Sequence, residues 1–160
     1  LLDGDSIWRT QNLNEIKSSG IELNSRINIR NILNSKINHF RISIASNKVD
    51  TISNGFRSAY VIDNLKNNFS FSVNHNFYKN IMVDWKVTYK ERIGDYFDLE
   101  QQIIKNYEPY WLTSVRMTKK INSNFNLFLD INNLFDINYS DYGTIVQPGR
   151  WARIGLKAKI

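Results

Sequence analysis

Hydrophobic and polar residues alternate along this chain in seven separate stretches. From Ile81 to Tyr89, for example, the odd positions are apolar or aromatic, and the even positions include Asp84, Lys86 and Thr88. A period of two places the two sets on opposite sides of a β-strand. The pattern predicts an all-β protein whose seven strands cover, to within a few residues, Asn12–Arg30, Ile37–Ser46, Lys66–Asn76, Ile81–Arg92, Tyr110–Lys119, Phe125–Asn133 and Trp151–Ile160.

The predicted connections alternate between short and long. The short ones are Asn31–Lys36, Phe77–Asn80 and Lys120–Asn124, and the long ones are Asn47–Leu65, Ile93–Pro109 and Leu134–Arg150. Short turns at one rim and long loops at the other are typical of outer-membrane barrels, and strands of about 9–11 residues can cross a bilayer at a tilt. The pattern therefore favours an antiparallel transmembrane β-barrel over a soluble β-sandwich binding module, in which structureless loops of this length are uncommon.

The charged side chains decide which face of such a barrel would meet lipid. A cation on the lipid face costs about 2–4 kcal/mol at the bilayer midplane, so the charged face is expected to line the lumen. Aromatic belts are expected at the two rims, with Tyr89, Trp111 and Trp151 near the long loops and Phe77, Tyr78 and Phe125 near the short turns. The expected polar wall of the lumen contains Asp84, Lys86, Arg116, Asp130, Arg153 and Lys157.

The number of strands indicates how much of a barrel is present. An antiparallel barrel closes with an even number of strands, and an open edge in hydrocarbon would leave backbone groups unpaired. Seven strands are therefore expected to be part of a larger barrel. If Ile7–Asn12 forms an additional strand, eight strands could instead close a small, self-contained porin or structural barrel.

Composition excludes several other classes of protein. The 160 residues contain no cysteine, which excludes disulfides and thiolate metal sites, and no apolar run is long enough for a transmembrane helix. The net charge is +6, but the basic residues are scattered, so no nucleic-acid partner is expected. The sequence has no Gly-x-Ser-x-Gly motif and no glycine-rich phosphate loop, and we expect no enzymatic activity, no cofactor and no metal.

The long connections contain aromatic residues that could contact a ligand. Rigid amphipathic rings suit the binding of a large ring system, although packing of the loops would explain the same residues. The candidate substrate contacts are Phe56, Tyr60, Tyr96, Phe97, Tyr139, Asp141 and Tyr142.

The C-terminal third carries the most specific motifs. It contains Asn133-Leu134-Phe135-Asp136, then Tyr139, Asp141-Tyr142-Gly143, then Gln147-Pro148-Gly149-Arg150-Trp151 and Gly155-Leu156. This order resembles the closing segment of TonB-dependent outer-membrane receptors. The segments Tyr60–Lys66 and Glu108–Trp111 are similar to the vitamin B12 receptor-like branch that is common in Bacteroidetes, and Asn12–Asn14 with Gly20–Leu23 resembles an earlier strand of the family.

The resemblance implies a role in transport. Members of this family are 22-stranded barrels closed by a plug domain, and they import cobalamin, haem or iron-siderophores across the outer membrane of Gram-negative bacteria. Residues 1–160 would then form the C-terminal part of such a barrel, without the plug. Its partners would be outer-membrane lipid, the rest of the barrel with its plug, the TonB energy-transducing complex acting through the plug, and as a further candidate a surface lipoprotein. The family usually ends in Phe or Trp, whereas this sequence ends in Ile160.

Overall fold

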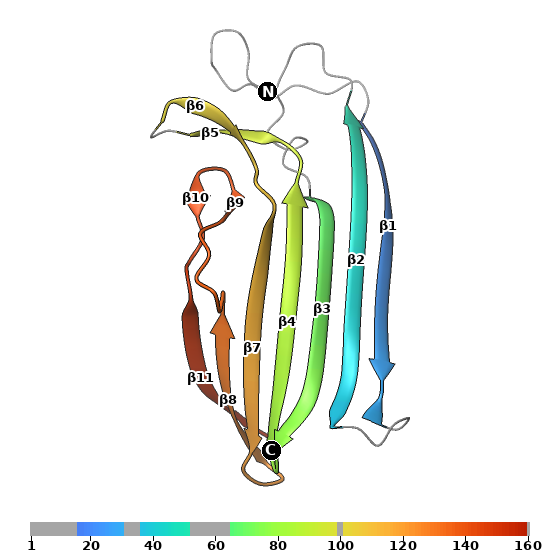
Figure 1. The fold of residues 1–160 in the computed structure, drawn as a ribbon, viewed down its shortest axis with the longest axis vertical. Helices are drawn as coiled ribbons and strands as arrows, with labels where there is room; N and C mark the ends of the chain where they lie inside the picture. The colour runs from blue at the N-terminus through green and yellow to red at the C-terminus, as the bar shows by residue number, and fades with distance from the viewer. Residues whose placement is uncertain (1–15, 31–35, 52–64, 99–100, 160) are drawn as a thin grey trace.

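A computed structural model describes residues 16–30, 36–51, 65–98 and 101–159 of the chain. They form one antiparallel sheet of seven strands in the order β1-β2-β3-β4-β7-β8-β11, so each long strand pairs with the next long strand along the chain (Figure 1). The strands of this sheet are β1 (Ile16–Asn28), β2 (Ile37–Thr51), β3 (Leu65–Tyr78), β4 (Ile81–Arg92), β7 (Tyr110–Lys120), β8 (Phe125–Asn132) and β11 (Trp151–Ala158).

Two small hairpins lie at the end of the sheet that carries the long connections (Figure 1). The first pairs β5 (Asp95–Asp98) with β6 (Ile103–Asn106), and the second pairs β9 (Ser140–Tyr142) with β10 (Ile145–Val146). Both fall in segments that the alternation pattern assigns to loops. In the part of the chain that the structure describes, no helix has the length and apolar character needed to cross a membrane.

The register aligns hydrophobic side chains across the whole width of the sheet. One row, here called the apolar row, contains a hydrophobic residue on every strand because the alternation of each strand is in phase with that of its neighbours. From β1 to β11 the apolar row is Ile27, Phe40, Val73, Trp85, Val115, Ile131 and Ala152.

The neighbouring row of paired residues points to the opposite face and is polar on every strand. We call it the polar row, and from β1 to β11 it is Asn28, His39, Asn74, Asp84, Arg116, Asp130 and Arg153. The sheet therefore has one hydrophobic face and one charged face along its entire width.

The hydrophobic face is not covered by a second layer of the described residues. Leu23 on β1 is 55% exposed and Ile154 on β11 is 71% exposed, and Trp85 in the middle of the sheet is also exposed. Among the described residues, the buried hydrophobic side chains are Val83, Tyr107, Tyr110 and Val115. A β-sandwich would bury one such face against a second sheet about 10 Å away. The described strands instead form a single layer.

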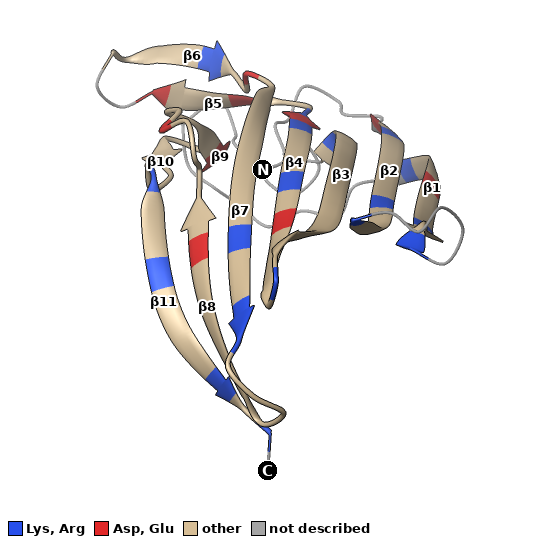
Figure 2. Ribbon diagram, turned by 60° about the horizontal axis from the view of Figure 1, so that its bottom comes forward, with Lys and Arg blue, Asp and Glu red and all other residues tan. Residues whose placement is uncertain are grey.

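The sheet is curved, and its polar face is the hollow one. Figure 2 shows the strands following an arc from β11 through β7 to β1. Side chains of the polar face on β2, β3, β4, β7, β8 and β11 line one common hollow of about 460 Å³, which includes Arg41, Lys86, Arg116 and Arg153. In the described residues, β1 and β11 are the two edges of the sheet and do not pair with each other, so the sheet is open.

The observed strands agree closely with those predicted from alternation, and the all-β antiparallel prediction is confirmed. The largest extensions are at the ends of β2 and β3, where the pairing continues beyond the alternating residues. One rim assignment was wrong. Trp151 pairs with Asn132 and lies on the same face as Arg153, so it belongs to the polar face and not to an outward aromatic belt.

Candidate functional site

The end of the polar row on β7, β8 and β11 is a network of ion pairs. Asp130 on β8 is 5% exposed and accepts hydrogen bonds from both neighbouring strands. Arg116 donates through Nε to Oδ1 at 2.5 Å and through Nη2 to Oδ2 at 2.8 Å, and Arg153 donates from Nε to Oδ2 at 2.7 Å. A buried carboxylate between two cations is stabilised in its ionised form, and the network fixes the relative positions of β7, β8 and β11.

A second group of hydrogen bonds connects side chains of β2, β3 and β4. Asn74 is buried, and its Nδ2 donates to Oδ2 of Asp84 at 2.6 Å. Asn38 Nδ2 donates in turn to Oδ1 of Asn74 at 2.6 Å. Hydrogen-bonded polar side chains therefore link β2, β3 and β4, as charged ones link β7, β8 and β11.

All six side chains predicted for a polar wall lie on the hollow face. Asp84, Arg116, Asp130 and Arg153 belong to the polar row, Lys86 pairs with Ser72 and Ser114, and Lys157 pairs with Asn126. Figure 2 shows these strands with Lys and Arg in blue and Asp and Glu in red. Only the alternation of charge between neighbouring strands, such as Asp84–Arg116–Asp130–Arg153, was not visible in the sequence, because it depends on the register.

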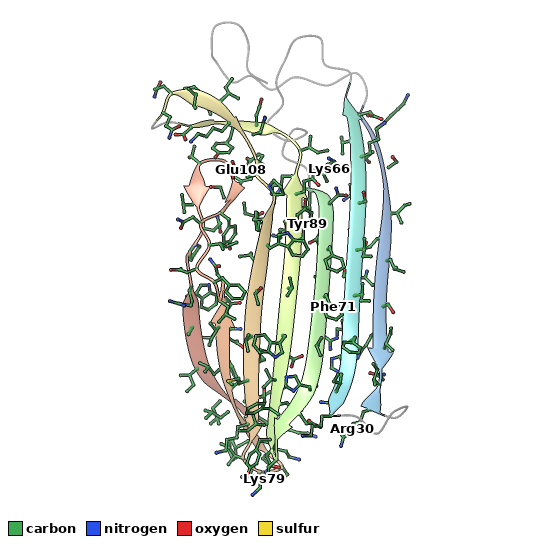
Figure 3. All side chains as sticks on the ribbon, in the orientation of Figure 1. Arg30, Lys66, Phe71, Lys79, Tyr89 and Glu108 are labelled. Carbon is green, nitrogen blue, oxygen red and sulfur yellow. The ribbon has the colours of Figure 1, made fainter. Side chains whose placement is uncertain are left out.

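Aromatic side chains gather toward the two ends of the hydrophobic face. At the long-loop end, the Trp111 ring lies 4.9 Å from that of Tyr89 and 6.3 Å from that of Phe69, between ring centroids. At the other end, Phe77 and Tyr78 are exposed. Figure 3 shows Tyr89 near one end of β4 and Lys79 at the opposite end of the sheet.

The two motifs around the last long connection meet in space. Asn133 directly follows β8 and has a positive φ of 49°, and its side chain accepts from Ile137 N at 3.0 Å and donates to Ile137 O at 2.8 Å. Asp136 Oδ1 accepts from the backbone N of Arg150 at 2.6 Å, next to Gly149, where a Cβ would come within 2.5 Å of the same oxygen. The Asn-Leu-Phe-Asp and Pro-Gly-Arg motifs thus form a clasp at the two ends of this connection.

The β9–β10 hairpin is fixed to the sheet through Asp141. Its Oδ1 accepts from Tyr110 OH at 2.7 Å and from Arg92 Nε at 3.1 Å, and its Oδ2 accepts from Lys90 Nζ at 3.1 Å. Burial alone would raise the pKa of the Asp141 carboxyl, but the hydrogen bonds from Tyr110, Lys90 and Arg92 outweigh it and hold the pKa below its usual value. Asp141, a candidate substrate contact, therefore has a structural role as an anchor.

A cleft of about 560 Å³ separates this hairpin from the β5–β6 hairpin. Two of the predicted contacts, Tyr96 and Tyr139, come together in its lining with Tyr107 and Tyr110. The rings form two pairs, Tyr96 with Tyr107 at 5.1 Å and Tyr110 with Tyr139 at 4.5 Å between centroids. Burial, followed by the charge of Asp141, raises the pKa of the Tyr139 phenol, which therefore stays neutral at physiological pH.

The other predicted contacts are not in this cleft. Phe97 on β5 and Tyr142 on β9 are exposed and do not line it. Phe56 and Tyr60 lie outside the described residues. Sequence reasoning missed Tyr107 and Tyr110. The sequence feature that could have indicated them is the run Tyr107-Glu108-Pro109-Tyr110, which places two tyrosines at the start of a strand.

Within residues 16–30, 36–51, 65–98 and 101–159, no group of three or more His, Asp or Glu side chains is placed to hold a metal ion.

No protein-family model matches the chain, and no curated protein matches it either.

Proposed function

We propose that this chain forms part of the wall of an outer-membrane β-barrel, and that the complete barrel is a receptor of the TonB-dependent type that imports a scarce nutrient. The observation that carries this proposal is the apolar row on a single curved sheet, which no second layer of the described residues covers. A contiguous hydrophobic surface of this width marks a contact with protein or membrane. Lipid chains provide such a contact without a second layer of protein.

The dimensions of the hydrophobic face support a membrane over a protein partner. On β4, the hydrophobic positions from Ile81 to Tyr89 span eight residue steps, or about 27 Å along the strand at roughly 3.4 Å per residue. A strand tilt of about 40° reduces this to about 21 Å along the membrane normal, close to the ~25 Å apolar band of outer-membrane barrels. The aromatic groups at the two ends of the face occupy the positions of interfacial girdles.

The polar face supports a water-filled interior. Arg116 and Arg153 pair with Asp130 across strands, and the same hollow, in which water can solvate the other cations, also contains Arg41 and Lys86. Two open edges would be costly in hydrocarbon, and no strand among the described residues pairs with the outer side of β1 or β11. Further strands are therefore proposed to complete the barrel, as in the receptor family that the C-terminal motifs resemble.

The proposal is tested on the protein expressed from its complete reading frame. We expect it to fractionate with the outer membrane, to need detergent for solubility, and to migrate on SDS gels at different positions before and after heating. The reading frame should also encode a plug region and additional alternating strands. A monodisperse species without detergent would contradict the proposal, and a heat-modifiable barrel formed by residues 1–160 alone would favour the small, self-contained barrel.

A further inference from the structure

We infer that the cleft between the β5–β6 and β9–β10 hairpins, here called the tyrosine cleft, binds a neutral oligosaccharide. Tyr96 and Tyr107 contribute to one side and Tyr110 and Tyr139 to the other. Its volume of about 560 Å³ lies within the range of roughly 300–1,000 Å³ that is typical of ligand sites. Binding at this cleft does not depend on the proposed receptor function, whereas import of the bound oligosaccharide does.

The tyrosine cleft is built in two layers that hold its rings in place. The inner rings, Tyr107 and Tyr110, are buried, at 7% and 8% exposure. Their hydroxyls are engaged, because Tyr107 OH accepts from Gly143 N at 2.7 Å and Tyr110 OH donates to Asp141. The hairpins therefore cannot slide past each other without breaking these bonds.

The outer rings are the ones that a ligand can reach. Tyr96 lies against Tyr107, and Tyr139 lies against Tyr110, and both outer rings are half-buried. Each is backed by a fixed inner ring, so little conformational entropy is lost when a ligand stacks on it. Aromatic faces carry partial negative charge, which attracts the weakly positive C–H groups on the flat side of a sugar ring.

The remaining lining suits hydroxyl groups. Asn106, Asn138 and Ser140 line the tyrosine cleft together with the exposed Glu108, whose place at the base of the first hairpin Figure 3 shows. Amides, a hydroxyl and a carboxylate provide both donors and acceptors for a polyhydroxylated ligand. The non-aromatic apolar lining is limited to Pro109 and Val146, which argues against a large apolar ring system.

The charges of the tyrosine cleft favour a neutral ligand over an anionic chelate. Lys105, the cation in its lining, forms an ion pair with Asp98 at 2.6 Å. The cations near the second hairpin, Lys90 and Arg92, are paired with Asp141. An anionic ligand such as an iron chelate would have to compete with Asp98 and Asp141 for these cations.

The test is calorimetric titration of the whole protein in a sugar-free detergent such as an amine oxide. The probes are maltohexaose, cellohexaose and isomaltohexaose, with cyanocobalamin and haemin as alternative ligands. We expect at least one oligosaccharide to bind, Tyr96→Ala and Tyr139→Ala each to weaken it about tenfold or more, and Tyr96→Phe and Tyr139→Phe to leave affinity within about threefold. The matched control is Tyr142→Ala. Tyr142 lies on β9, three residues after Tyr139, but outside the cleft lining, so this variant should bind the oligosaccharide like the original protein.

Two results would overturn the inference. One is that no oligosaccharide binds even at about 10 mM, well above the concentration at which weak sites fill. The other is that cyanocobalamin or haemin binds and loses affinity in Tyr139→Ala. The heat-dependent gel shift of each variant is measured in parallel, so failure of sugar binding in a folded barrel is distinguished from failure of the membrane proposal.

Discussion

Leu23 and Asn24 are neighbours on β1 whose side chains point to opposite faces of the sheet. Leu23 pairs with Ile44 on the hydrophobic face, and Asn24 pairs with Ser43 on the polar face. Both side chains are exposed, and both lie at the same level of the same edge strand. Replacing each with arginine therefore changes the same amount of charge in two different environments.

The expected difference in stability between the two variants follows from the depth of Leu23 in the membrane. Leu23 is five residue steps from the end of β1 at Asn28, which is about 17 Å along the strand and about 13 Å along the normal at a tilt near 40°. This is half of the ~25 Å apolar band, so Leu23→Arg places a cation near the midplane at a cost of about 2–4 kcal/mol. Such a cost lowers the folding equilibrium constant by roughly 25- to 700-fold.

Asn24→Arg has no comparable cost because its side chain faces the hollow. The substitution removes the hydrogen bonds of Asn24 with Glu22 and Ser43. Both bonds are exposed to solvent and contribute little to the free energy of unfolding. In a protein surrounded by water, both substitutions would be surface changes within about ±0.5 kcal/mol. The membrane proposal therefore predicts a large difference between two adjacent residues, and a water-exposed sheet predicts almost none.

The assay is equilibrium urea titration of the whole protein in phospholipid vesicles. Unfolding is monitored by the heat-dependent gel shift and by tryptophan fluorescence. The comparison needs only the difference between the two variants, so common errors of extrapolation cancel. A Leu23→Arg variant as stable as Asn24→Arg, within about 0.5 kcal/mol, would refute the assignment of the hydrophobic face to lipid.

Two further predictions concern single contacts. The pKa of Asp141 is depressed in the folded protein, so its bonds to Lys90 and Arg92 stabilise the β9–β10 hairpin above a pH of about 4 and are lost as the pH falls through the folded pKa. Hydrogen exchange of the hairpin, corrected for intrinsic rates, should rise below that pH, and a hairpin equally protected in Asp141→Asn at neutral pH would contradict this. Gly155→Ala should destabilise the sheet by about 1–3 kcal/mol, because a Cβ there would come within 3 Å of the Phe128 ring. In urea titrations Phe128→Leu should relieve most of that penalty, and an additive effect of the two changes would refute the clash.

The strands themselves could be predicted from the sequence because alternation is a local property. Ile81–Arg92 was predicted with the same bounds that β4 has, and the starts of β7, β8 and β11 agree as well. A period of two in hydrophobicity fixes both the extended backbone and the face of each side chain, without knowledge of the partner strand.

The register, and everything built on it, is decided by the tertiary structure. The sequence shows that Asp130 lies on a polar face, but only pairing with β7 and β11 brings it between Arg116 and Arg153. Trp151 was misplaced for a related reason. Its position beside a long loop predicted an interfacial role, whereas pairing with Asn132 determined its face.

The tyrosine cleft depends still more on tertiary structure. Tyr96 and Tyr139 are separated by two long strands in sequence and come together only because two hairpins form inside segments without alternation. The hydrogen bonds that hold the β9–β10 hairpin join its residues Asp141 and Gly143 to Tyr110 and Tyr107, and such contacts leave no periodic pattern in the sequence. Alternation along the chain therefore predicts a two-faced antiparallel sheet, because the face and the extension of a strand are local properties. Contacts between strands and hairpins set which charges pair and which residues line the tyrosine cleft.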